Sequence, residues 1–121
     1  MTANEFLAYI DYFHSKQYDA YYTDDIVFHL PTKLLVGKQA VKDWYNHLNQ
    51  FVEEILYVKK VLSEGDVLMA HIGTDFRCIK DWPDFTAKPL KKGEVYHGEY
   101  LILYKIRGGK FCEVSSARLT S

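Results

Sequence analysis

Apolar and polar side chains alternate on both sides of Gly65 in the segment EEILYVKKVLSEGDVLMAHIGTDFRCI, residues 53–79. A period of two is typical of β-strands, and Glu64–Asp66 has the composition of the turn between them. The segment EVYHGEYLILYKIRGGKFCEVSSARL, residues 94–119, repeats this pattern around Gly108 and Gly109. The sequence therefore predicts two hairpins, or four long antiparallel strands.

The N-terminal half has mainly helical spacing. Thr2 and Glu5 stand at the separation of a capping box, and apolar residues follow at helical intervals up to Phe13. We expect a short helical piece over residues 17–25, a strand within DDIVFHLP (residues 24–31), and a long amphipathic helix over residues 37–52. Helices gathered on one face of a curved antiparallel sheet define an α+β domain.

The composition limits the classes of partner. A chain of 121 residues is predicted to form one domain, residues 1–121. The formal net charge is −1 and the 15 basic residues are scattered, so we expect neither nucleic acid nor a membrane surface as partner. Cys78 and Cys112 are far apart and form no CxxC pair, which favours a reducing compartment. Without an apolar signal segment, the protein is expected to be soluble and cytoplasmic.

Period two also assigns the faces of the strands. In the predicted strand that begins at Val67, one face is predicted to line the core. It carries Leu68, Ala70, Ile72, Thr74 and Phe76. In the next strand the same reasoning places Tyr100 and Tyr104 inside. The opposite face carries five polar residues: His71, Asp75, Arg77, His97 and Glu99. Two interpretations stay open for this group, solvated or dimer-interface charges and an active site.

Several residues are candidates for proton chemistry. His29 lies two residues before Pro31 in a strand that is apolar on both sides, and a desolvated neutral imidazole can act as a base near neutral pH. A structural histidine bonded to the backbone is the alternative. Arg118 could hold an enolate or carboxylate oxygen, or could simply be solvated. The loop KDWPDFTAKPLKKG, residues 80–93, is long enough to fold over a site.

No pattern in the sequence indicates a cofactor or a metal. It contains no glycine-rich phosphate loop, no GxSxG, and no HxxxH or HExxH pair. We therefore expect any catalysis to use neither a cofactor nor a metal, and to depend on acid–base groups in an aromatic cavity. Ten tyrosines make such a cavity plausible, because a tyrosine combines an apolar ring with one hydroxyl.

Three stretches together resemble the nuclear transport factor 2-like superfamily, in its SnoaL-like and ketosteroid isomerase-like branch. They are TDDIVFHLP (residues 23–31), GKQAVKDWYNHL (residues 37–48) and LYKIRGGKFCEVSSARL (residues 103–119). The resemblance covers essentially the whole chain and implies a cone-shaped fold that often pairs sheet to sheet. Members of this superfamily include isomerases, cyclases, dehydratases, epoxide hydrolases and binding proteins, so the fold leaves the function open.

The isomerase pattern fails at its catalytic positions, because Leu30, Phe6 and Ile102 stand where that family has its base and its oxyanion donors. The same resemblance implies that Tyr22, Trp44 and Tyr45 form the pocket wall. Tyr9, one helical turn after Phe6, is a candidate for the missing phenol. The "HSKQYD" segment is similar to scytalone dehydratase, and "DFR" has the residue types of limonene epoxide hydrolase in the opposite order.

Three hypotheses follow. The first is an isomerase, cyclase or dehydratase of polycyclic or polyketide-like molecules, with His29 moving the proton and Tyr9, Tyr100 or Tyr104 bonding the oxyanion. Its apolar wall would comprise Tyr22, Phe28, Trp44, Tyr45 and Phe76. The second is a binding module without catalysis. The third is an epoxide hydrolase-like enzyme built on Asp75, Arg77 and Glu99, which requires that face to look inward.

Overall fold

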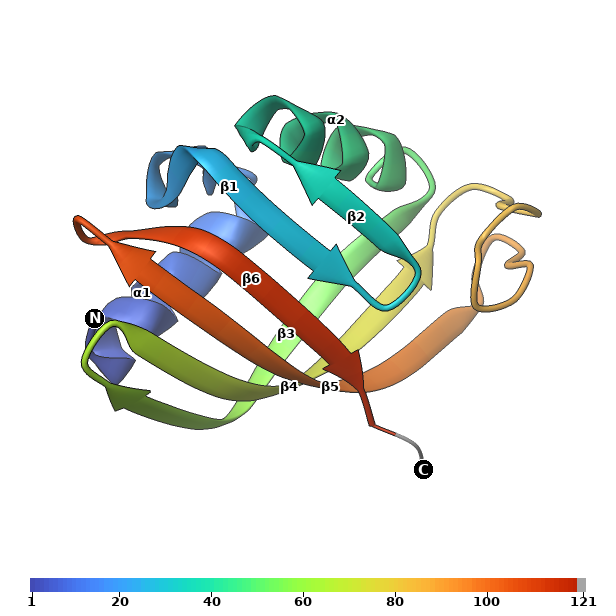
Figure 1. The fold of residues 1–121 in the computed structure, drawn as a ribbon. Coiled ribbons are helices and arrows are strands. Elements are labelled where there is room, and N and C mark those ends of the chain that lie inside the picture. Colours follow the sequence, from blue (N-terminus) through green and yellow to red (C-terminus); the bar gives the residue numbers. More distant parts are fainter. Residues whose placement is uncertain (120–121) are drawn as a thin grey trace.

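Residues 1–119 are described by a computed structural model, in which two helices pack against a six-stranded sheet (Figure 1). The elements in chain order are α1 (Ala3–His14), a 3₁₀ turn (Asp19–Tyr21), β1 (Tyr22–Leu30), β2 (Lys33–Val36), α2 (Lys38–Leu48), β3 (Val52–Glu64), β4 (Val67–Cys78), β5 (Val95–Arg107) and β6 (Lys110–Arg118). The predicted α+β architecture is confirmed, with a curved, open sheet wrapped around the helices.

The sheet has the order β2-β1-β6-β5-β4-β3. The four long strands β3 to β6 pair antiparallel, as predicted. The prediction of a purely antiparallel sheet is wrong at one seam, because β1 runs parallel to β6. Everything from β2 to β5 forms the connection between these two strands, and such a long crossover is what a parallel pair requires.

Helix α1 begins with the predicted capping box. The Glu5 amide donates to Thr2 Oγ1 and the Thr2 amide donates to Glu5 Oε1, each at 3.1 Å. At the other end, His14 Nε2 accepts a 2.9 Å hydrogen bond from the Leu56 amide of the edge strand β3. The helix is therefore fixed across the open edge of the sheet. Within residues 1–119, no helix has both the length and the apolar character needed to span a membrane.

Three local predictions need correction. The helical part of residues 17–25 is limited to the 3₁₀ turn Asp19–Tyr21, because the chain joins β1 at Tyr22, which pairs with Phe111. Strand β2 was not predicted, since its four residues are too short to show alternation. Helix α2 ends at Leu48, and from Val52 the chain belongs to β3.

Two clusters of buried side chains make up the core. The larger one lies between α1, α2 and the concave face of the sheet, and Phe6, Tyr22 and Phe111 have no exposed surface in it. The smaller one lies under the 80–93 loop and includes Trp82 and Leu90, which are 4% and 2% exposed. The loop therefore contributes its own side chains to the core.

Candidate functional site in the concave face of the sheet

A cavity of about 410 Å³ lies between the concave face of the sheet, the two helices and the 80–93 loop. This volume suits a ligand of one to a few rings. Its walls are mostly aromatic and aliphatic: Tyr9, Phe13, Phe28, Leu30, Trp44, Tyr45, Leu48, Leu56, Phe76, Phe85, Tyr100, Ile102, Tyr104 and Val114. Exposed residues such as Thr32, Thr86 and Arg118 form the rim. The cavity therefore has a hydrophobic interior and a polar mouth.

Glu54 is the one carboxylate among the described residues that line this cavity. It pairs with Phe76 across the β3–β4 ladder, and this register turns it onto the concave face. Its Oε1 atom is fully buried and has no hydrogen-bond partner within residues 1–119. Burial raises the pKa of Glu54 to about 7, while the nearby Lys16 charge acts weakly in the opposite direction. A carboxyl group with this pKa can both accept and return a proton near neutral pH.

Five tyrosines lie close enough to Glu54 for its charge to raise their pKa, in addition to the larger effect of their own burial. They are Tyr9, Tyr18, Tyr45, Tyr100 and Tyr104. Their phenols therefore stay protonated at neutral pH and are hydrogen-bond donors. Four of them, all except Tyr18, line the cavity itself. The site combines one proton-transfer group with several neutral donors in an apolar enclosure.

Tyr9 and Tyr22 form a hydrogen-bonded pair, with 2.6 Å between their hydroxyl oxygens. Tyr9 lies on the cavity wall, whereas Tyr22 is completely buried behind it. When the Tyr22 hydroxyl donates to Tyr9, the proton of Tyr9 is free to bond a ligand oxygen. In that arrangement Tyr9 would be a fixed donor of the kind that stabilises an oxyanion.

Most of the aromatic residues predicted from the sequence meet in this cavity. Tyr9, Tyr100, Tyr104 and Arg118 line it, together with Phe28, Trp44, Tyr45 and Phe76. Tyr22 supports the wall from behind through its bond to Tyr9. Leu30 and Ile102, which replace two catalytic positions of the isomerase pattern, are apolar wall residues. The predicted faces of β4 and β5 are therefore correct, whereas the chemical roles stay predictions.

The predicted position of His29 is wrong. Phe28 and Leu30 line the cavity, so the alternation of β1 directs His29 to the opposite face of the sheet. There the His29 side chain is 48% exposed, with Nε2 3.1 Å from Oε2 of Glu113. A solvated imidazole on the convex face cannot reach a ligand in the cavity. The carboxyl group that does line the cavity is that of Glu54, which the sequence analysis did not single out.

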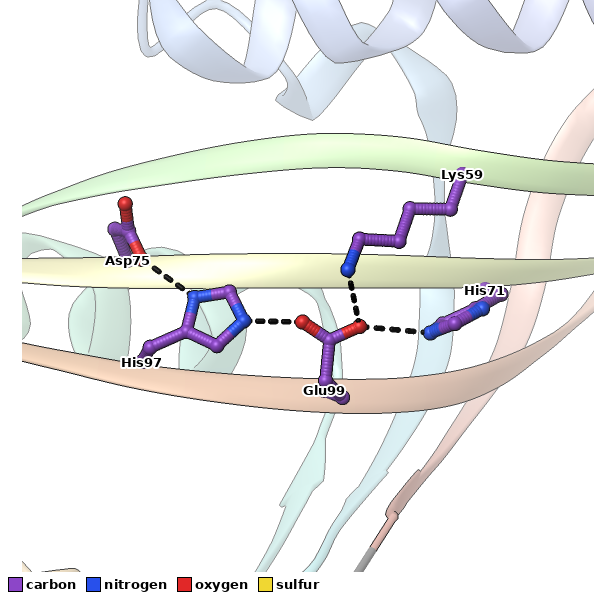
Figure 2. A network of polar contacts seen from close by, with 5 residues as sticks. All are labelled: Lys59, His71, Asp75, His97 and Glu99. Atoms are coloured by element: carbon purple, nitrogen blue, oxygen red, sulfur yellow. Dashed lines mark hydrogen bonds and ion pairs between the residues drawn. The ribbon is translucent and has the colours of Figure 1, made fainter. Parts of the chain in front are cut away.

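The polar residues of β4 and β5 form a network on the convex face (Figure 2). Glu99 is its centre, with Oε1 2.7 Å from Lys59 Nζ and 2.8 Å from His71 Nε2. His97 bridges Glu99 and Asp75, with 2.6 Å between Nδ1 and Asp75 Oδ1. These contacts lower the pKa of Glu99 to about 2, with the Lys59 hydrogen bond as the main cause, and raise the pKa of His97, mainly through Asp75.

The epoxide hydrolase hypothesis required this group to face inward, and it does not. Arg77, its remaining member, pairs with Glu53 at 2.5 Å on the same convex face. The side chains of Glu99, His97 and Lys59 crowd Gly73, where a Cβ atom would lie 2.9 Å from Glu99 Oε2. Among the described residues, no group of three or more His, Cys, Asp or Glu side chains is arranged to hold a metal ion.

The chain belongs to the family of SnoaL-like domains, whose profile matches residues 3–114. No curated protein matched the sequence. Among solved structures, a protein from Pseudomonas putida KT2440 described as a candidate polyketide cyclase is similar over 97% of this chain and 91% of its own, with 20% identity and a TM-score of 0.80.

A second structure with a similar fold is a hypothetical protein from Catenulispora acidiphila DSM 44928, which has a ketosteroid isomerase-like fold and was solved with trimethylamine. It covers 97% of this chain and 86% of its own, at 9% identity and a TM-score of 0.74. At these identities the structural likeness shows a common fold and not a common reaction.

Proposed function

We propose that this protein is an acid–base enzyme of the isomerase, cyclase or dehydratase type, which acts without a cofactor on an apolar, ring-containing small molecule. The carboxyl group of Glu54, a half-buried residue whose Oε1 atom is fully buried, carries the proposal, because it is the one acid among the described cavity-lining residues and has a pKa of about 7. General bases work best when their pKa lies near the working pH. A purely structural role would not favour a carboxyl group with one oxygen buried and unpaired, because this costs stability.

In the proposed reaction, ionised Glu54 removes a proton from a carbon next to a ligand carbonyl group. The negative charge moves to the carbonyl oxygen, which accepts a hydrogen bond from Tyr9, and Tyr22 holds Tyr9 in place. Glu54 can then return the proton to a different carbon, giving an isomer. Alternatively, the enolate carbon attacks a second carbonyl group of the molecule and closes a ring, and Glu54 returns its proton to the alkoxide that forms. In a dehydration, Glu54 gives its proton to a β-hydroxyl group, which leaves as water while the enolate becomes an α,β-unsaturated carbonyl.

The proposal can be tested without the natural substrate. 2-Tetralone is a bicyclic ketone whose α-protons exchange with D₂O when a base and an oxyanion donor act on it, and NMR follows this exchange. We expect the protein to accelerate the exchange, and we expect Glu54→Gln to remove at least about 99% of that acceleration. Glu113→Gln, a carboxylate change on the convex face, is the matched control and should leave it intact.

Two outcomes would contradict the proposal. Equal exchange rates with Glu54→Gln and wild type would remove Glu54 from the reaction. Saturable binding of 2-tetralone with no accelerated exchange in the wild type would favour the alternative, a binding module that uses the same cavity.

We also propose that two copies of the chain pair through the convex face. Tyr57, Met69 and Leu101 lie on this face beside the ionic network and are 47%, 42% and 40% exposed. Light scattering should give the mass of a dimer, and Leu101→Glu should convert it to a monomer. Leu7→Glu, at an apolar position of α1 that is 45% exposed and lies away from the sheet's convex face, is the control. A wild-type monomer at micromolar concentration would refute the pairing.

A further inference from the structure

Arg118 is the one basic side chain among the described residues that line the cavity. It is paired with Tyr100 across the β5–β6 ladder, and this register places it on the concave face. Its guanidinium carbon lies 5.0 Å from the centre of the Tyr96 ring, a cation–π contact that orients the side chain. No carboxylate within residues 1–119 forms an ion pair with it. Arg118 therefore presents an oriented positive charge at the rim.

The charge of Arg118 and that of Glu54 act on the same part of the cavity. The pKa of Tyr100 is raised mainly by burial, and on this background Arg118 lowers it while Glu54 raises it. Tyr100 thus lies within electrostatic range of both groups. The cavity has a cation at its exposed rim, a carboxyl group in its interior, and aromatic walls between them. A ligand that matches all three parts has a flat apolar body and one anionic end.

We propose that the natural ligand of this cavity is a ring-containing carboxylate whose anionic group is held by Arg118. The inference rests on the proposed function, since it takes the cavity as the ligand site. A guanidinium group presents parallel N–H donors that match the two oxygens of a carboxylate. Binding at the rim would leave the ring system in the aromatic interior, with its reactive carbon directed towards Glu54. Arg118 then selects and orients the ligand, whereas Glu54 performs the proton transfer.

Lys33 is the rival cation near the rim. Its Nζ lies 4.2 Å from the centre of the Trp44 ring, but Lys33 is not among the cavity-lining residues. The ammonium group is therefore on the outside of an aromatic wall residue. A test has to separate the two cations.

Calorimetry with two matched probes makes this test. 2-Naphthoate carries the carboxylate, and 2-naphthamide is its neutral counterpart of nearly the same shape. We expect the wild-type protein to bind 2-naphthoate at least about tenfold more tightly than 2-naphthamide. Arg118→Gln should remove this preference, because it should weaken the binding of 2-naphthoate at least about tenfold more than the binding of 2-naphthamide. Lys33→Gln should keep the preference.

The outcomes distinguish this inference from the proposed function. Equal wild-type affinity for both probes would overturn the role of Arg118 while the cavity remained a ligand site. Loss of the preference in Lys33→Gln with retention in Arg118→Gln would also overturn it. If the wild type binds neither probe, the cavity is not a site for such ligands, and the proposed function is contradicted together with the role of Arg118.

Discussion

Gly98 shows how one residue shapes the candidate site. A Cβ atom at this position would lie 2.6 Å from the hydroxyl oxygen of Tyr100 and 2.7 Å from its Cε2 atom. The Tyr100 ring therefore lies folded back along β5, over the surface that a side chain at residue 98 would occupy. The absence of a side chain at Gly98 sets the position of a cavity-wall phenol.

We predict that Gly98→Ala displaces the Tyr100 ring and lowers the free energy of unfolding by roughly 1–3 kcal/mol, as overpacking does. The strain should depend on the ring, so the same substitution in a Tyr100→Ala background should cost much less. Urea denaturation of the four proteins in this cycle measures the coupling. Equal costs in the two backgrounds would show that Tyr100 is not held by Gly98.

Residues 29 and 54 show why single positions were harder to predict than strands. Ile26 and Phe28 alternate with Val27 and His29, and both sets are largely apolar, so period two could not tell which set faces inward. Glu54 follows Glu53, and either could have been the solvent-facing one. The pairing of Phe28 with Val114, and of Glu54 with Phe76, decides both cases, and this register is not visible in one sequence.

The 80–93 loop is the element that completes the cavity. Its base is closed by two hydrogen bonds between Trp82 and Leu90, of 2.7 and 3.0 Å. The Trp82 ring stacks on Phe51 with 4.8 Å between ring centres and 13° between planes. These contacts hold the middle of the loop, including Phe85, against the cavity.

We predict that Phe85→Ala weakens the binding of 2-naphthamide by about tenfold, because it removes an aromatic contact from the cavity wall. Lys88→Ala, in the same loop but away from the cavity lining, should have no effect. Calorimetry checks both variants. Unchanged affinity in Phe85→Ala would mean that the loop does not enclose the ligand in solution.

The elements that could be predicted have strong local signals. The alternation of β3 to β6 and the capping box at Thr2 each arise from neighbouring residues, so the sequence alone was sufficient. The parallel pairing of β1 with β6 joins residues more than 80 positions apart, such as Phe28 and Val114. No local pattern encodes such a contact. This pairing nevertheless decides which side chains of β1 lie on the concave face.

At the scale of the whole molecule, Glu54 couples proton binding to stability. The folded protein keeps the Glu54 proton up to a pH of about 7, whereas an ordinary glutamate has a pKa of 4.5. Between these values the folded state holds a proton that the unfolded state has lost. A rise in pH over this range therefore lowers the free energy of unfolding. Glu99 acts in the opposite direction, because its lowered pKa means that its contribution is lost in acid.

We predict that the free energy of unfolding of Glu54→Gln does not show this decrease as the pH rises. The difference in free energy of unfolding, variant minus wild type, should therefore be roughly 2–3 kcal/mol larger at pH 8 than at pH 5. Denaturation at several pH values measures the difference, with Glu53→Gln, the neighbour on the opposite face of β3, as control. A difference that does not change with pH would show that Glu54 is not buried as described.

The most direct measurement is the pKa of Glu54 itself. Protein labelled with ¹³C at the glutamate side-chain carboxyl carbon would be titrated by NMR, and the signal missing from Glu54→Gln would identify the residue. We predict a midpoint of about 7, because desolvation of the carboxyl group, whose Oε1 atom is buried without a hydrogen-bond partner, disfavours its charged form. A midpoint near the ordinary value of 4.5 would mean that water reaches the carboxylate, and would contradict its role as the acid–base group.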